Sequence, residues 1–267
     1  MDFGKRTITA LILLAFVFIS IQYFSRPVFF LFLQAVILVA LYEFLNLAEK
    51  RKILPLKAFG LIMAMIVSLP FYFSCIDLAL ALFLVLFLAG IYFVVSVNKI
   101  EKLPLFPSSI GLAFFGVVYL SFTLNHISLL REERGPLYVY YLFAVIFVGD
   151  TGAYLLGKLV GKRKMTPLAS PKKTWEGGLG GIVAACLGGW IAQQVLLPEM
   201  GVIRGIVFAF IVHAVAQVSD PLESLFKRAV GVKDSSNILP GHGGILDRAD
   251  SLILATPFYY YLLRYFF

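Results

Sequence analysis

The last third of the sequence concentrates the side chains that could bind phosphate or a metal ion. Eleven polar and glycine residues follow one another there at short intervals: Ser224, Lys227, Arg228, Lys233, Asp234, His242, Gly243, Gly244, Asp247, Arg248 and Asp250. Carboxylate oxygens are the ligands that hard cations prefer, and lysine and arginine bind phosphate. Glycines let backbone N–H groups approach an anion. This mixture predicts a site that holds a polyphosphate together with a hard divalent cation.

A helix entering this segment would align further polar groups with it. At 100° per residue, His213, Gln217, Asp220, Ser224 and Lys227 fall within roughly 80° of one another. Lipid would not tolerate such a polar face, so we expect it to line a protein cavity or a water-filled groove. The alternative is a polar seam that only holds helices together.

Two earlier segments carry similar groups. Asp150 lies among small residues within an apolar run. It is either a ligand or a structural carboxylate paired with a Lys or Arg, and both interpretations stay open. Lys172 and Lys173 precede Thr174, which we expect to cap the next helix. A helix N-terminus behind two lysines is a suitable phosphate site. The basic run at residues 162–164 is typical of contact with anionic lipid.

The elements that position these groups belong to a membrane protein. Of the 267 residues, 60% are hydrophobic and 14% charged, which excludes a soluble globular enzyme and a disordered chain. The two cysteines, Cys75 and Cys186, lie in separate apolar runs and indicate no disulfide framework. The net charge of +8 favours anionic lipid or phosphate as partners, and not nucleic acid.

We therefore predict an all-α, polytopic integral membrane protein with about nine transmembrane helices. Runs of the length that a spanning helix needs occur nine times. They are Thr7–Phe24, Pro27–Leu47, Leu54–Phe73, Leu78–Val97, Pro107–Leu124, Leu137–Leu156, Gly178–Leu197, Val202–Ser219 and Ser251–Phe267. With nine spans, 18 of the 23 Lys and Arg residues fall on one side, which predicts a cytoplasmic N-terminus and an outward C-terminus in a plasma (inner) membrane.

The two longest polar loops, at about residues 158–177 and 221–250, then face the cytoplasm. We expect two regions. Residues 1–135 would be a five-helix scaffold or dimerisation surface, with almost no buried ionisable group, and a homodimer is one outcome. Residues 136–267 would be a four-helix catalytic region that carries both motif loops.

The segment from Ser224 to Asp250 resembles the C-terminal signature of the phosphatidate cytidylyltransferase family, also called CDP-diacylglycerol synthases. That signature reads Ser-x-x-Lys-Arg-x4-Lys-Asp and then His-Gly-Gly-x-x-Asp-Arg-x-Asp, and every interval is kept here. Residues 149–154 and 170–177 resemble the family as well. Where such proteins usually read Gly-Asp-Leu, this chain has Ser219-Asp220-Pro221.

The resemblance implies that CTP and phosphatidic acid react at the lipid bilayer to give CDP-diacylglycerol and pyrophosphate, and that the reaction requires Mg²⁺. Whether a second cation takes part stays open. Asp220 and Asp247 would bind the metal, and Asp150 and Asp250 would be further ligands or lie around them. The phosphate-binding set would be Lys172, Lys173, Lys227, Arg228, Lys233 and Arg248, with Ser224 beside it. Loop-shaping groups would be Asp234, His242, Gly243 and Gly244; His242 as a ligand, an acid/base group or a phosphate donor stays open.

Two rival functions predict different distributions of polar groups. A CTP-dependent polyprenol or dolichol kinase would transfer the γ-phosphate to a lipid alcohol and would need a group that activates a hydroxyl; His242 is the loop histidine available. A membrane transporter would place polar groups along a path across the bilayer. The polar groups here concentrate towards the predicted cytoplasmic face.

Overall fold

The structure is a computed structural model, and it describes residues 3–50, 54, 56–239, 241 and 243–267. The chain forms two compact units. The first comprises Met1–Ser128 and Val230–Arg248, and the second comprises Leu129–Ala229 and Ala249–Phe267. The division into a scaffold and a catalytic region, expected at residue 135, stays a prediction. The segment Val230–Arg248, however, groups with the N-terminal helices and not with the C-terminal region.

The first unit is a bundle of apolar helices. Its elements are α1 (Phe3–Tyr23), α2 (Arg26–Glu49), α3 (Lys57–Ser68), η1 (Leu69–Phe71), α4 (Leu78–Ser96), η2 (Ile100–Leu105), α5 (Phe106–Gly116) and the π-helical turn η3 (Val117–Phe122). Pro27 lies in the first turn of α2, where a missing N–H is harmless. Asp77 caps α4 by accepting hydrogen bonds from the N–H groups of Ala79 and Leu80.

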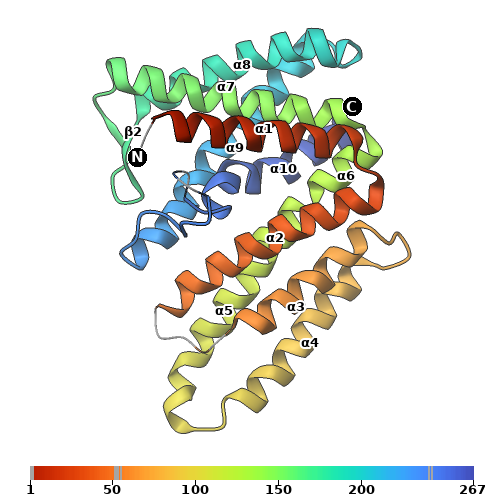
Figure 1. The fold of residues 1–267 in the computed structure, drawn as a ribbon, viewed down its shortest axis with the longest axis vertical. Coiled ribbons are helices and arrows are strands. Elements are labelled where there is room, and N and C mark those ends of the chain that lie inside the picture. The colour runs from red at the N-terminus through yellow and green to blue at the C-terminus, as the bar shows by residue number, and fades with distance from the viewer. Residues whose placement is uncertain (1–2, 51–53, 55, 240, 242) are drawn as a thin grey trace. The chain divides into compact units, whose positions relative to one another are not determined.

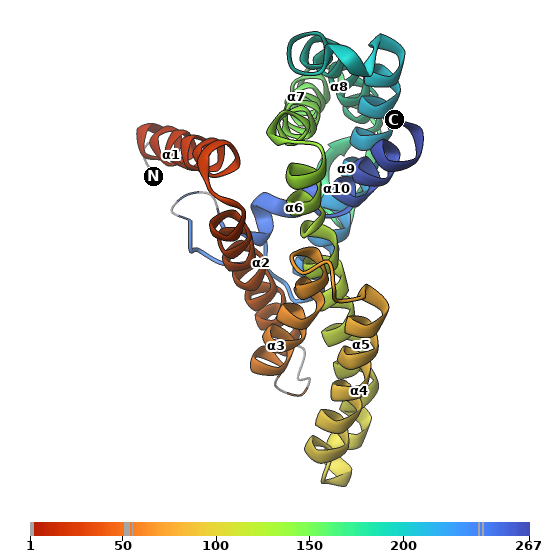
Figure 2. The same cartoon turned by 90° about the vertical axis from the view of Figure 1, so that its right-hand side faces the viewer.

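The core of the first unit lies where α3 packs against α2, α4 and η3 (Figure 2). A buried polar network crosses it: Gln34 donates to Asn125 at 2.7 Å, and Asn125 donates to Ser68 at 2.9 Å. The Ser68 hydroxyl lies 2.9 Å from the Ser121 hydroxyl. Because unpaired polar groups are costly in an apolar environment, these mutual bonds fix how α2, α3 and η3 meet.

The second unit is built around three long helices. Its elements are α7 (Pro136–Val160), β1 (Lys164–Thr166), β2 (Ser170–Thr174), α8 (Trp175–Leu196), η4 (Pro198–Met200), α9 (Val202–Ala229) and most of α10 (Leu246–Phe266); α6 (His126–Glu133) leads into it. Helices α7 and α8 lie side by side along their length (Figure 1). A Cβ at Gly177 would approach the Ala153 carbonyl oxygen to 2.8 Å and the Gly157 Cα to 2.9 Å. Glycines thus permit the close contact of these two helices.

Each of the nine predicted apolar runs contains a helix over most of its described residues. Among the described residues, six helical segments are long and apolar enough to span a membrane: Arg26–Glu49, Leu78–Ser96, Ile100–Glu133, Pro136–Val160, Trp175–Leu196 and Val202–Ala229. The described apolar helices at Leu11–Tyr23 and Lys57–Phe71 are shorter. The all-α, integral membrane class is confirmed, and the number nine stays a prediction. The run predicted at Pro107–Leu124 is part of the longer segment Ile100–Glu133.

A short β-hairpin joins α7 to α8. Strands β1 and β2 pair antiparallel between α7 and α8, with Lys164 opposite Thr174. Thr174 caps α8, as predicted, because its hydroxyl accepts a hydrogen bond from Gly177 N–H at 3.2 Å. Glu176 in the first turn accepts from the N–H groups of Lys162 and Arg163 at 3.0 and 3.2 Å. The loop that carries Lys172 and Lys173 is therefore held at the start of α8.

Candidate functional site

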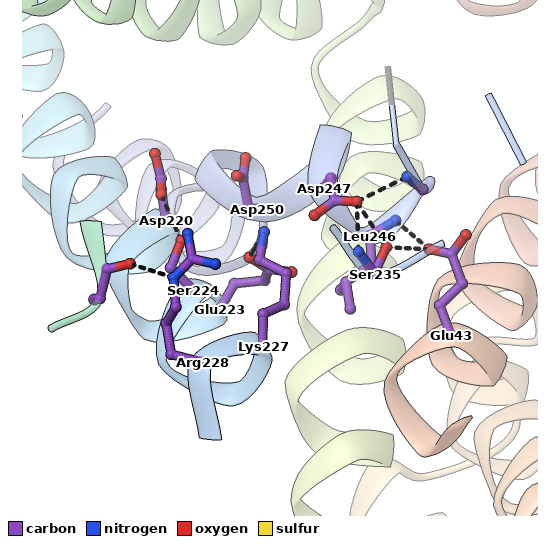
Figure 3. A network of polar contacts seen from close by, with 12 residues as sticks. Glu43, Asp220, Glu223, Ser224, Lys227, Arg228, Ser235, Leu246, Asp247 and Asp250 are labelled. Carbon is purple, nitrogen blue, oxygen red and sulfur yellow. Dashed lines mark hydrogen bonds and ion pairs between the residues drawn. The ribbon is translucent and has the colours of Figure 1, made fainter. Parts of the chain in front are cut away.

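In the second unit, α9 brings Asp220 to a lysine of the β-hairpin. The Asp220 carboxylate lies 2.7 Å from the Lys173 ammonium, and both side chains are about a quarter exposed. The Ser224 hydroxyl, one turn further along α9, lies 3.5 Å from Asp220 Oδ1 (Figure 3). Helix α9 continues through Pro221 without ending. The structure therefore joins two predicted site segments, the hairpin and the polar face of α9.

Asp220 lies among other carboxylates of the same unit. Its charge interacts with those of Asp150 on α7 and Asp250 on α10, and Asp220 and Asp250 point to the same side in Figure 3. Ser251 joins these two neighbours: its hydroxyl donates to Asp150 at 3.2 Å, and its N–H donates to Asp250 at 2.7 Å. Asp150 thus has a hydroxyl and like charges as neighbours, with Lys173 as the nearby cation.

The Ser219 side chain ties α9 to α10 at this point. Its hydroxyl donates to the carbonyl oxygen of Asp250 and accepts from Leu254 N–H at 3.3 Å. A glycine, which the family usually has at this position, could form neither bond. In this chain Ser219 supplies a link between the helices that carry Asp220 and Asp250.

Lys227 forms a buried ion pair that sequence reasoning missed. Its ammonium lies 2.6 Å from Glu223 on the preceding turn, and the two side chains are 8% and 1% exposed. Arg228, next to it, is exposed and donates from Nε to the carbonyl oxygen of Ala169 at 3.3 Å, in the turn of the hairpin. The two neighbouring cations therefore have different surroundings, one inside the unit and one at its surface.

The polar face of α9 divides into two parts. Gln217 donates to the carbonyl oxygen of Gly178 on α8 at 2.7 Å. His213 is fully buried against Gly149 and Gly181, and neither ring nitrogen has a hydrogen-bond partner among the described residues. This half of the face is a packing seam between helices. The other half, from Asp220 onwards, carries the charged groups.

The first unit contains the loop between α9 and α10, residues 230–245, which we call the signature loop. Asp247, in the first turn of α10, is 5% exposed. Its Oδ2 accepts from the Ser235 N–H at 2.9 Å, the Ser235 hydroxyl at 2.8 Å and the Gly244 N–H at 2.7 Å. The loop closes on itself where Leu239 N–H donates to the Gly243 carbonyl at 2.9 Å. Asp247 thus organises the loop as well as being a candidate ligand.

Glu43 on α2 is the second carboxylate that organises this loop. It is 2% exposed and accepts from Ser235, Ser236, Ile245 and Leu246 (Figure 3). The expectation that the first five spans hold almost no buried ionisable group is therefore wrong at this position. The signal for Glu43 was present in the sequence as a lone carboxylate within the apolar run 27–47.

The remaining predicted groups differ in their exposure. Exposed side chains with predicted phosphate or loop roles are Lys172, Lys233, Asp234 and Arg248. Ser224 is buried. Gly243 has φ +81°, a conformation that favours glycine, and a Cβ there would lie 2.7 Å from Asp247 Oδ2. His242 lies outside the described residues, so its role stays a prediction.

The oxygen donors of this site suit a hard divalent cation, because they are carboxylates and hydroxyls. Among the described residues, no three His, Cys, Asp or Glu side chains converge closely enough to hold a metal ion. Lys173 is the cation that Asp220 contacts in this structure. Asp220 belongs to the second unit and Asp247 to the first. A metal held by Asp220 and Asp247, with Asp150 and Asp250, therefore stays a prediction.

Comparison with known proteins places these residues in a family. The model of the family described as "Cytidylyltransferase family" matches residues 4–266. A protein of Bacillus subtilis named phosphatidate cytidylyltransferase is 34% identical over 274 residues, which cover 99% of each chain. A protein of the same name from Staphylococcus haemolyticus is 33% identical over 94% of this chain and 95% of its own. One from Haemophilus influenzae is 41% identical over 50% of this chain and 47% of its own.

Proposed function

The chain belongs to the cytidylyltransferase family, and we propose that it is the membrane enzyme that makes CDP-diacylglycerol and pyrophosphate from CTP and phosphatidic acid. The observation that carries this function is the likeness to phosphatidate cytidylyltransferases over nearly the whole chain. These relatives do not favour a lipid kinase or a transporter. The reaction is a step of phospholipid biosynthesis.

The reaction needs little from an acid or a base. A phosphate oxygen of phosphatidic acid attacks the α-phosphorus of CTP, and the bond to the β-phosphate oxygen breaks in line with it. Pyrophosphate leaves with that electron pair, and a new P–O–P bond joins the lipid phosphate to CMP. Since a phosphate monoester is already ionised near neutral pH, no strong base is required. Orientation of the substrates and neutralisation of charge then account for most of the catalysis.

The cations assigned to that neutralisation come from α9, the hairpin, the signature loop and the first turn of α10. Lys172, Lys233 and Arg248 are exposed and suited to a soluble triphosphate. Lys173 is held beside Asp220 at 2.7 Å, so substrate phosphates compete with a carboxylate for it. Arg228 is held in place by its hydrogen bond to the Ala169 carbonyl oxygen. Lys227, the neighbour of Arg228 on α9, is paired with Glu223 inside the unit, so a substrate phosphate competes with that carboxylate for it as well.

Mg²⁺ is part of the proposal. The carboxylates assigned to it are Asp220 and Asp247, with Asp150 and Asp250 as further candidates; the support is their all-oxygen chemistry. When bound, Mg²⁺ lowers the negative charge of the triphosphate and of the departing pyrophosphate. A second cation and a homodimer stay predictions.

The helices and the charges support a proposal for the cellular setting. The chain is a membrane protein, since six of its described helical segments could span a bilayer. We place it in the plasma membrane with the site at the cytoplasmic face, because the positive residues of its loops are biased to one side. A site there has access to CTP from the cytoplasm and to phosphatidic acid from the bilayer.

A product analysis tests the function. The purified protein in detergent is given CTP and Mg²⁺ with either phosphatidic acid or a polyprenol, and products are identified by mass. We expect CDP-diacylglycerol and pyrophosphate in equal amounts from phosphatidic acid, and no product from polyprenol. Formation of CDP and polyprenyl phosphate would contradict the proposal.

A further inference from the structure

We infer that Glu43, on α2 of the N-terminal helices, is a positioning residue for the reaction: it holds the signature loop and the start of α10 in the shape that Asp247 and its neighbours need. The inference rests on the proposed function. It assigns a role in the reaction to a region whose sequence otherwise indicates only a membrane scaffold.

The contacts of Glu43 converge from two sides of the loop. Its Oε2 accepts from the Ser235 hydroxyl at 3.0 Å and from Leu246 N–H at 2.8 Å. Its Oε1 accepts from the Ser236 hydroxyl at 2.5 Å and from Ile245 N–H at 3.2 Å. All five residues belong to the first unit. A residue about 190–200 positions away in the sequence therefore joins the first half of the loop to its C-terminal end.

The chemistry of these contacts suits a carboxylate and no other side chain. Three hydrogen-bond donors meet its two oxygens, together with the Ser235 hydroxyl, whose single proton is shared with Asp247. An ionised carboxylate accepts at both oxygens while donating nothing. Two of the donors are N–H groups at the N-terminus of α10, which have no partner within the helix and favour a negative charge. Glu43 thus caps a helix that begins 203 positions later, with Leu246.

The second glycine of the His-Gly-Gly motif is explained by the same carboxylate. A Cβ at Gly244 would lie 2.6 Å from Glu43 Oε1 and closer still to the Ser235 hydroxyl. Any larger residue would push the loop away from Glu43. This close approach is independent of the hydrogen bonds and indicates that the loop is shaped to fit the Glu43 side chain.

Glu43 and Asp247 share Ser235 as a common partner. The Ser235 hydroxyl lies 3.0 Å from Glu43 Oε2 and 2.8 Å from Asp247 Oδ2. A change at Glu43 therefore reaches Asp247 through one side chain, and it reaches the backbone of Leu246 directly. Substrates need not contact Glu43 for its loss to alter turnover.

The test compares Glu43→Gln with Glu49→Gln, a matched control on the same helix. Glu49 pairs with Lys57 and accepts from Leu56 N–H, and it forms no hydrogen bond or ion pair with the signature loop among the residues that the structure describes. We expect Glu43→Gln to lose roughly tenfold to a hundredfold in kcat, because its amide N–H would face donors, with a smaller change in KM for CTP. Glu49→Gln should stay within about twofold of the wild type.

A double-substitution cycle separates positioning from general stability. Glu43→Gln and Ser235→Ala should be strongly non-additive in kcat, because each breaks the same connection to Asp247. Independent, multiplicative losses, or wild-type turnover by Glu43→Gln, would overturn the inference. A wild-type protein that makes no CDP-diacylglycerol would instead overturn the proposed function.

A milder variant decides the matter if Glu43→Gln cannot be purified folded. Ser236→Ala removes one bond to Glu43 and leaves Asp247 untouched. We expect a several-fold loss in kcat with an unchanged elution volume and melting temperature. Wild-type kcat for Ser236→Ala would then overturn the inference.

Discussion

Asp220 and Asp247 have different surroundings although the sequence indicates the same role for both. Asp220 is a quarter exposed and faces Lys173, whereas Asp247 is buried and accepts three hydrogen bonds at one oxygen. An Asn at either position keeps the size and removes the charge. We therefore expect the two variants to be alike in activity and unlike in stability.

Asp220→Asn should abolish cytidylyl transfer or require far more Mg²⁺, because an amide binds a hard cation weakly. Its melting temperature should change little, since a partly exposed ion pair contributes about 0–1 kcal/mol. The measurement is activity against Mg²⁺ concentration beside thermal unfolding in detergent. An unchanged Mg²⁺ dependence would contradict the ligand assignment.

Asp247→Asn should also abolish activity, and in addition lower the free energy of unfolding by about 1.5–3 kcal/mol. The physical reason is the loss of charge-assisted bonds from Ser235 and Gly244 inside the first unit. Thermal unfolding of both Asn variants in the same detergent checks this. Equal melting temperatures for Asp247→Asn and the wild type would show that these bonds contribute nothing.

Lys227→Gln should be strongly destabilising because it leaves the Glu223 carboxylate buried without its cation. The expected cost is about 3–5 kcal/mol. Replacing both partners, as Glu223→Leu with Lys227→Met, should recover most of that stability. A double variant as unstable as Lys227→Gln would show that the pair is not the cause.

At the scale of single residues, the types and spacing of side chains predict which residues belong to the site. They do not predict which residues those side chains contact. The cations, aspartates and glycines of residues 220–250 are recognisable without a structure. Glu43 stands out as a lone carboxylate in an apolar run, but its partner Ser235 does not. The pairing of Glu223 with Lys227 is missed because Lys227 is predicted to bind phosphate. The pairing of Glu43 with Ser235 spans 192 positions, beyond any local pattern.

At the scale of elements, the contact between α7 and α8 depends on glycines. Gly177→Ala should lower the melting temperature, at a cost of about 1–3 kcal/mol, because its Cβ would press on backbone atoms of Ala153 and Gly157 that cannot rotate away. Gly90→Ala on α4 is the control, since nothing lies within 4 Å of its Cβ position. Equal melting temperatures for the two variants would contradict this account of the helix contact.

Hydropathy predicts where these helices lie, and it does not predict their details. The helix at Val202–Ala229 extends ten residues beyond its apolar run, because charged residues continue a helix as readily as apolar ones. The π-helical turn at Val117–Phe122 has no composition signal either. Thr174 was recognisable as a cap because capping depends on local sequence.

For the whole molecule, the bias of positive charge predicts the orientation. In a background with Cys75 and Cys186 replaced by Ser, Lys164→Cys should react with an impermeant maleimide added at the cytoplasmic side. Arg204→Cys should react from the opposite side, because the two lie at opposite ends of a predicted span. Labelling of Lys164→Cys from the periplasmic side alone would contradict the topology.

The division of the chain into compact units does not follow sequence order. Val230–Arg248 groups with the N-terminal unit, although it lies between two helices of the C-terminal half. Sequence order favours the adjacent helices α9 and α10 as packing partners of the signature loop. In the structure, Glu43 on α2 is a partner of this loop. The N-terminal helices, for which the sequence indicates only a scaffold, therefore take part in shaping the signature loop.

The central claim is that cytidylyl transfer to phosphatidic acid is the reaction, and the fate of the α-phosphate of CTP tests it most directly. The purified protein, Mg²⁺ and phosphatidic acid are incubated with CTP labelled at either the α- or the γ-phosphate, and the lipid is extracted and counted. We predict that the α-label enters the lipid, while the γ-label stays in water as pyrophosphate. Entry of the γ-label into lipid, with the α-label left in water, would contradict the claim.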